Sequence, residues 1–157
     1  MKRDRGFVKT VVEELKPYEV EHTEAAIKLD AMENPYPLPK ALKELLVEKV
    51  KEVCINRYPD PNAKRLKEVY SRLVGIKPEN LIIGNGSDEL IQLILTAAVN
   101  PGGKVLFPLP TFSMYGIIAK PLNLHCIEVP LDEAAWELDE EQFIAVVKKE
   151  KPSVIFI

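Results

Sequence analysis

The chain has 157 residues, of which 46% are hydrophobic and 29% charged, and its formal net charge is −3. These values are typical of a globular domain with a hydrophobic core and argue against a disordered chain. No run of Lys and Arg alternates with aromatic residues and no apolar run reaches membrane-spanning length, so neither nucleic acid nor a membrane is an expected partner. Cys54 and Cys126 lie far apart without a CxxC motif, so the sequence predicts no disulfide framework and no metal site, and a reducing cytoplasm fits.

The N-terminal segment predicts a short arm. Apolar residues between Phe7 and Leu15 have helical spacing, and Pro17 ends that pattern. The segment is amphipathic and lacks the core of a signal peptide, so we expect no targeting segment. Such arms often pack on a partner subunit. Residues 27–29 predict a short strand, and the prolines between Pro35 and Pro39 exclude regular structure from the loop that follows.

Two amphipathic helices are predicted next. The first, at residues 40–53, has one apolar stripe and is expected to bury that face. A proline-rich turn, RYPDPN, occupies residues 57–62, and Asn62 is expected to cap the second helix, which ends at Gly75.

After Pro78 the pattern alternates between strands and helices. Strands are predicted at residues 81–83, 104–107, 124–129 and 153–157, with helices at 88–99, 112–119 and 140–149. This alternation predicts an α/β fold with a mostly parallel sheet flanked by helices. Asp139 and Gln142 have the spacing of a capping box at the start of the last helix.

The stretch LIIGNGSDELIQLILTAAV, residues 81–99, is the main candidate for a site. Gly84 and Gly86 suit a tight turn after a strand, and Ser87 is the expected N-cap of a helix that is apolar all round and therefore buried. Free amides and the helix dipole make such a start suitable for a phosphate or carboxylate. An ordinary capped core helix explains the same pattern, because neither GxGxxG nor a Walker lysine is present.

Four motifs in fixed order carry a resemblance: KLDAMENPYPLP at residues 28–39, RYPDPN at 57–62, IGNGSDELI at 83–91 and PLPTFSMY at 108–115. With them, residues 7–157 resemble the N-terminal portion of the histidinol-phosphate aminotransferase family, within the fold-type I enzymes that use pyridoxal 5′-phosphate (PLP). Met32 and Pro37 differ from the sequence motif NENPYG that is common in that family. The resemblance therefore determines the substrate less closely than the fold. The resemblance implies an arm with small-domain and dimer-contact elements at residues 1–76 and the first part of the PLP-binding large domain at 77–157.

The resemblance also implies site residues. Amides around Ser87 and Asp88 would hold the PLP phosphate, Phe112 would stack on the pyridine ring, and Tyr58 would reach the cofactor of the neighbouring subunit in a homodimer. Asn34 and Tyr36 match the loop that covers the substrate side. Core packing for Phe112, and plain turn or loop positions for the two tyrosines, are the alternatives.

No catalytic residue is expected within the chain, because the family's Schiff-base lysine would lie beyond Ile157. The implied activity is transfer of an amino group between histidinol phosphate and 2-oxoglutarate in the cytoplasm. Two alternatives stay open: another fold-type I enzyme, such as an aromatic aminotransferase or a phosphothreonine-type decarboxylase, or an inactive module for cofactor phosphate or dimerisation. The roles of His22, His125 and Tyr115 are left open.

Overall fold

The computed structural model describes residues 7–15 and 33–157. Within the described part, residues 7–15 and 82–157 form one compact unit, here unit 1, and residues 33–81 form a second, unit 2. The strand predicted at residues 27–29 and His22 lie outside the described residues. None of the helices in the described ranges is long and apolar enough to cross a membrane.

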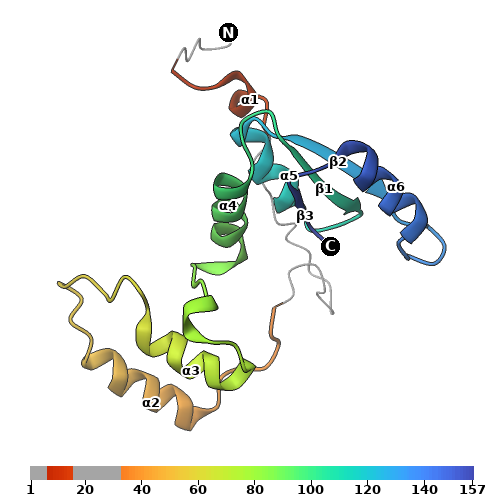
Figure 1. Cartoon of the computed structure of the whole chain (residues 1–157). Helices are drawn as coiled ribbons and strands as arrows, with labels where there is room; N and C mark the ends of the chain where they lie inside the picture. The colour runs from red at the N-terminus through yellow and green to blue at the C-terminus, as the bar shows by residue number, and fades with distance from the viewer. Residues whose placement is uncertain (1–6, 16–32) are drawn as a thin grey trace. The chain divides into compact units, whose positions relative to one another are not determined.

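Unit 1 is built on three parallel strands, β1 (Lys104–Leu109), β2 (His125–Pro130) and β3 (Val154–Ile155), in the order β2-β1-β3 (Figure 1). β1 is central: Lys104 lies opposite His125 of β2, and Val105 lies opposite Val154 of β3. The predicted mostly parallel sheet is therefore confirmed, with the carboxyl ends of its strands at one edge.

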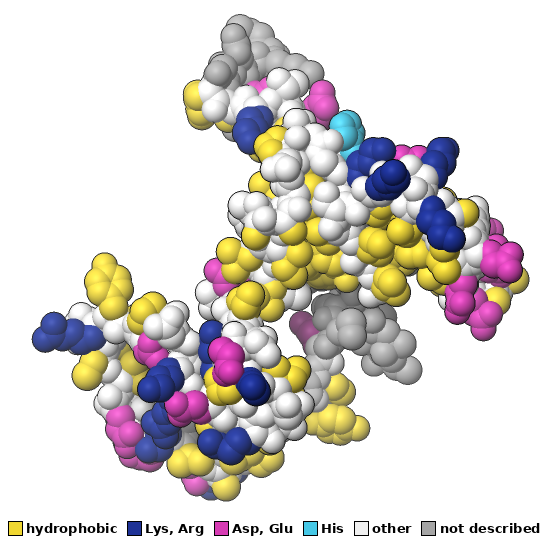
Figure 2. Space-filling model, viewed as in Figure 1, with side chains coloured by type: hydrophobic (Ala, Val, Ile, Leu, Met, Phe, Trp, Pro, Cys, Tyr) yellow, Lys and Arg dark blue, Asp and Glu magenta, His cyan; other side chains and the backbone are white. Residues whose placement is uncertain are grey.

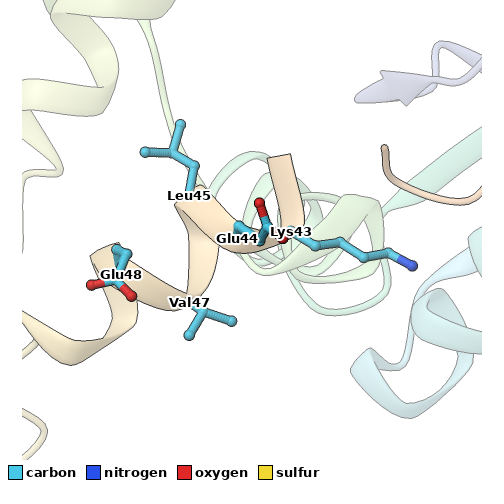
Figure 3. Close-up of a pocket in the computed structure, with 5 residues that line it drawn as sticks. All are labelled: Lys43, Glu44, Leu45, Val47 and Glu48. Carbon is cyan, nitrogen blue, oxygen red and sulfur yellow. The ribbon is translucent and has the colours of Figure 1, made fainter. Parts of the chain in front are cut away.

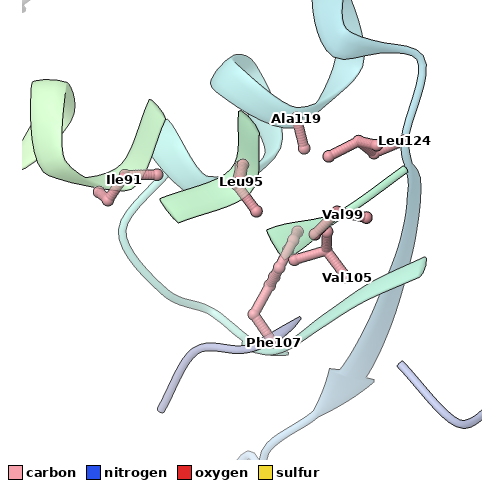
Figure 4. Close-up of a cluster of buried hydrophobic side chains, with 7 residues drawn as sticks. All are labelled: Ile91, Leu95, Val99, Val105, Phe107, Ala119 and Leu124. Carbon is pink, nitrogen blue, oxygen red and sulfur yellow. The ribbon is translucent and has the colours of Figure 1, made fainter. Parts of the chain in front are cut away.

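Helices cover both faces of this sheet. Side chains of β1 alternate between the faces, as the pleat of a strand requires. On one face, α4 (Gly86–Ala98) and α5 (Met114–Ala119) cover a cluster of buried side chains, drawn in Figure 4: Ile91, Leu95, Val99, Val105, Phe107, Ala119 and Leu124. On the other face, α6 (Glu140–Glu150) packs Phe143 against Leu106 and Val129. The predicted cap of α6 is confirmed, since the Asp139 carboxylate accepts the Gln142 N–H at 3.0 Å.

The arm, α1 (Thr10–Glu13), contacts the short 3₁₀ turn η2 (Lys120–Leu122) of its own chain. The Lys9 ammonium donates to the Pro121 carbonyl at 3.3 Å. The arm thus packs against η2 within unit 1, and contact with a partner subunit stays a prediction.

Unit 2 contains α2 (Lys40–Lys51), α3 (Lys64–Val74) and the 3₁₀ turn η1 (Pro78–Asn80). Gly75 ends α3 in the left-handed conformation, φ 70°, as predicted. The cap at the start of α3 is different from the prediction. The Asp60 carboxylate, and not Asn62, accepts the N–H groups of Lys64 at 2.8 Å and Asn62 at 3.0 Å. These backbone hydrogen bonds lower the pKa of Asp60.

Three further expectations are wrong. Residues 81–83 form no strand, and the sheet of the described residues consists of β2, β1 and β3 only. The helix after the turn is buried only on the face that carries Ile91 and Leu95, while Leu93 and Ile94 on its other side are exposed. The stripe of α2 is likewise exposed, with no buried residue. Figure 2 shows hydrophobic side chains on the surface of both units.

Candidate functional site

The start of α4 is shaped by two glycines and one carboxylate. Gly86 takes a φ of +83°, which side chains rarely tolerate, and this lets the chain turn directly into the helix. Gly84 lies so close to the helix that a Cβ there would sit 2.9 Å from Leu90 Cδ2. The Glu89 carboxylate reaches back and accepts the Asn85 N–H, which closes the turn. The segment from Gly84 to Glu89 is thus a compact loop held by its own contacts.

This geometry leaves the amides of the first helical turn available. α4 begins at Gly86 with Asn85 as the N-cap, so the predicted cap at Ser87 is wrong: Ser87 already lies inside the first turn. No side chain caps α4. The N–H groups of Gly86, Ser87 and Asp88 therefore point past the end of the helix, where backbone donors and the dipole favour an anion.

The acidic side chains in the first turn of α4 partly oppose the binding of an anion there. Asp88 and Glu89 place two carboxylates in the first turn of α4. Glu89 is occupied by the Asn85 amide, and the segment from Gly84 to Glu89 contains no Lys or Arg. A phosphate at this turn would therefore be held by uncapped backbone amides and not by a cationic side chain from this segment. The residues present fit the phosphate group of PLP on these grounds.

An aromatic group lies after β1, at the start of α5. Phe112 is 45% exposed, and its ring meets that of Tyr115 edge-on, with centroids 5.7 Å apart. Tyr115 also stacks on Phe156, which follows β3, at 4.3 Å. Because α5 packs against α4, Phe112 and the amides of Ser87 and Asp88 belong to neighbouring elements of unit 1.

The remaining predicted site residues lie in unit 2. Tyr58 is fully exposed in the proline-rich turn, and Tyr36 is 80% exposed. The Asn34 side-chain oxygen accepts the Tyr36 N–H at 3.0 Å and so shapes the backbone of that loop. Asn34, Tyr36 and Tyr58 therefore present polar side chains to the surface, and their roles stay predictions.

Two functional features were missed in the sequence. Glu89 follows Asn85 by four residues, the spacing at which a side chain near a helix start can reach back to a preceding amide, so its role was readable from NGSDE. The stacking of Tyr115 on Phe156 had no such signal, since 41 positions separate residue 115 from residue 156.

The surface hollows do not compete with this site. One in unit 2 is lined by Lys43, Glu44, Leu45, Val47 and Glu48 of α2 alone, and Figure 3 shows their side chains pointing in different directions. Another follows the ends of β1 and β2 and combines acidic with apolar side chains, a lining that repels phosphate. It is lined by Leu109, Pro110, Pro130, Leu131, Asp132, Glu133 and Trp136. Across the described ranges, no group of three or more His, Cys, Asp or Glu side chains is arranged to hold a metal.

The two cysteines are free and differ in environment. Cys54 is exposed, whereas Cys126 is half-buried beside the core, and burial raises the pKa of its thiol. Neither lies in the turn or the aromatic group described above.

Comparison with known proteins identifies relatives along nearly all of the chain. The profile of the family aminotransferase class I and II matches residues 24–157. Histidinol-phosphate aminotransferase of Aquifex aeolicus is 43% identical over 90% of this chain, and histidinol-phosphate aminotransferase 2 of Nitrosococcus oceani is 41% identical over 100% of it. The chain spans only 40% and 44% of the length of these two relatives.

Solved structures share the fold. Histidinol-phosphate aminotransferase from Sinorhizobium meliloti, in complex with pyridoxal-5′-phosphate, superposes with a TM-score of 0.65 at 24% identity, covering 77% of this chain and 32% of that one. Tyrosine aminotransferase from Leishmania infantum gives 0.59 at 27% identity, covering 71% and 34%. These likenesses confirm the predicted α/β fold.

Proposed function

The chain belongs to the aminotransferase class I and II family, and from this premise we propose that it is the N-terminal part of a PLP-dependent aminotransferase acting on histidinol phosphate and 2-oxoglutarate. The observation that carries the proposal is the start of α4, where a glycine turn leaves the amides of Gly86, Ser87 and Asp88 without a side-chain cap. The relatives at 43% and 41% identity, which are named for this substrate, support the choice of amino donor.

Each site residue has a distinct task in this proposal. The amides of Ser87 and Asp88 bind the cofactor phosphate, and the Phe112 ring packs on the pyridine face. When bound, PLP supplies the electron sink for chemistry at the carbon that bears the amino group. Asn34 and Tyr36 cover the substrate side of the site.

We also propose a homodimer in the cytoplasm. The fully exposed Tyr58 ring is free to contact a partner, and in a dimer it would reach the phosphate held by the other subunit. The cysteines, Cys54 and Cys126, are both free, as a reducing compartment requires.

No lysine within the chain is assigned to the chemistry. The lysine that binds the cofactor covalently is proposed to follow Ile157, in the part of the relatives that this chain does not span. The 157-residue chain by itself should bind PLP weakly and reversibly and transfer no amino group. Tight stoichiometric labelling of one lysine of this chain, after reduction with borohydride, would contradict that assignment.

The test is an amino-donor comparison with the protein as its gene encodes it. Histidinol phosphate with 2-oxoglutarate should yield glutamate in the presence of PLP, whereas histidinol, which lacks the phosphate, should react far more slowly. Faster transfer from tyrosine would favour the aromatic aminotransferase, and release of carbon dioxide from phosphothreonine would favour the decarboxylase. Failure of every donor despite tight PLP binding would favour the inactive module.

A further inference from the structure

Four aromatic rings of unit 1 form a connected group, and Tyr115 is at its centre. The Tyr115 ring is parallel to that of Phe156, with an interplanar angle of 2° and centroids 4.3 Å apart. It is perpendicular to Phe112, at 87° and 5.7 Å, and tilted against Phe107, at 44° and 6.0 Å. Offset-stacked and edge-to-face pairs at such separations are favourable.

The group is anchored on its inner side. Phe107 is 2% exposed within the buried cluster under α4 and α5. Phe156 is held by its backbone, whose N–H donates to the Leu106 carbonyl at 2.9 Å. Tyr115 lies between these two rings and is itself partly buried. Its orientation is therefore determined by neighbours that belong to the sheet.

The outer member, Phe112, has no such anchor of its own. It lies in the loop between β1 and α5 and is 45% exposed, the only one of the four rings that reaches the surface to this extent. A half-exposed ring in a loop can adopt several rotamers, and holding it in one before a ligand arrives reduces the entropic cost of binding. The perpendicular contact with Tyr115 supplies that restriction.

We propose that Tyr115 is a positioning residue, which with Phe156 holds the Phe112 ring ready to stack on the cofactor. The inference rests on the proposed function, because the ligand of Phe112 is the PLP ring. It extends that function to two residues that have no contact with the cofactor assigned to them and act only through Phe112.

A double-mutant cycle in the protein as its gene encodes it tests this directly. Tyr115→Leu should raise the PLP dissociation constant about threefold to tenfold, the size expected for one aromatic contact. Tyr115→Phe, which keeps the ring, should restore the affinity. In a Phe112→Leu background, Tyr115→Leu should have no further effect. Tyr70→Leu, a tyrosine replacement on α3, is the matched control and should leave PLP affinity unchanged.

Two further readouts separate positioning from general damage. Inorganic phosphate has no ring for Phe112 to stack on and binds through the donors at the start of α4, so Tyr115→Leu should leave its binding unchanged. The visible circular dichroism of bound PLP should weaken in both Tyr115→Leu and Phe112→Leu, since it reports the asymmetric packing of the cofactor ring. If Tyr115→Leu does not fold, Phe156→Leu replaces it in the cycle, because it removes the stacking partner and keeps Tyr115.

Additive losses in the cycle, or equal weakening of PLP and phosphate binding, would overturn the inference and leave Tyr115 as a packing residue. If the unsubstituted protein binds no PLP, the proposed function fails and the inference falls with it. If that protein binds PLP and Phe112→Leu weakens binding while Tyr115→Leu and Phe156→Leu do not, only the inference fails.

Discussion

Gly86 and Ser87 show how single residues set up the candidate site. The φ of +83° at Gly86 brings the chain into α4 without a capping side chain, so the first amides of the helix remain as donors. Ser87 contributes one of those amides from inside the first turn, and its hydroxyl is a separate, second donor. The two contributions can be separated by substitution.

Ser87→Pro should remove the amide as well as the hydroxyl. Proline is tolerated in the first turn of a helix, where the N–H has no partner within the helix, so α4 should persist. Losing a charge-assisted hydrogen bond of about 1.5 to 3 kcal/mol should weaken PLP binding by roughly tenfold or more. Ser87→Ala, which keeps the amide, should have a smaller effect. Equilibrium dialysis with PLP measures both, and an equal loss in the two variants would contradict a role for the amide.

At the scale of elements, the sheet and its helices meet through contacts that tolerate little change. Gly103 lies between α4 and β1, and a Cβ there would sit 2.7 Å from Val99 Cγ1 and 2.8 Å from the Asn100 carbonyl oxygen. Lys104, the next residue, joins the start of β1 to the end of α6 by an ion pair with Glu150 at 2.9 Å. The contact at Gly103 is steric and predicts a loss of stability when a side chain is added. The ion pair of Lys104 is electrostatic and predicts a stability that depends on pH.

Gly103→Ala should destabilise the chain by about 1 to 3 kcal/mol, the usual cost of overpacking, because the backbone carbonyl of Asn100 cannot move away alone. Gly116→Ala is the matched control. Its Cβ would meet Phe107 Cζ at an ordinary 3.6 Å, and alanine favours the helix α5, so stability should be unchanged or slightly higher. Urea unfolding of both variants of the 157-residue chain checks this, and equal midpoints would contradict the steric argument.

The ion pair predicts a dependence of stability on pH. The hydrogen bond from Lys104 lowers the pKa of Glu150 below its ordinary value of 4.5, and Lys149 adds a weaker attraction. A carboxylate whose pKa is lowered by folding stabilises the folded state above its unfolded pKa. The contribution is therefore complete above pH 4.5 and disappears as the pH falls through the lowered pKa.

Lys104→Gln should accordingly lower the melting temperature at pH 6 and make little difference near pH 2. Lys149→Gln is the control, because its side chain is 81% exposed against 42% for Lys104 and solvent screens its pairing. Thermal unfolding of the 157-residue chain across this pH range provides the measurement. A constant difference between the unsubstituted chain and Lys104→Gln at all pH values would refute the electrostatic explanation.

At the scale of the whole molecule, the two units differ in how much they bury. All ten buried hydrophobic residues among those described belong to unit 1, whereas neither α2 nor α3 has a buried residue. In their apolar stripes, Leu45, Leu46 and Leu73 are more than half exposed. Opening a helix that buries little apolar surface requires little free energy.

Amide hydrogen exchange of the 157-residue chain should therefore be slowest in α4, β1 and β2 and fast throughout α2 and α3. The pattern follows from burial and not from helix length, because α2 and α4 have nearly equal lengths of 12 and 13 residues. Mass spectrometry after deuterium labelling resolves these segments. Protection in α2 and α3 equal to that of α4 would show that their apolar stripes are covered in solution.

The sequence by itself determined the order of the α-helices and of the strands β1 to β3, the parallel sheet, the Asp139 cap of α6 and the Gly75 end of α3, because periodicity, caps and turn residues act within a few positions of the chain. The motifs likewise identified the glycine turn before α4. Only the tertiary structure decided that residues 81–83 lack a paired strand, that one face of α4 stays exposed, and that Tyr115 stacks on Phe156. Each of these depends on which segments distant in sequence lie beside it, and local patterns carry no information about such neighbours.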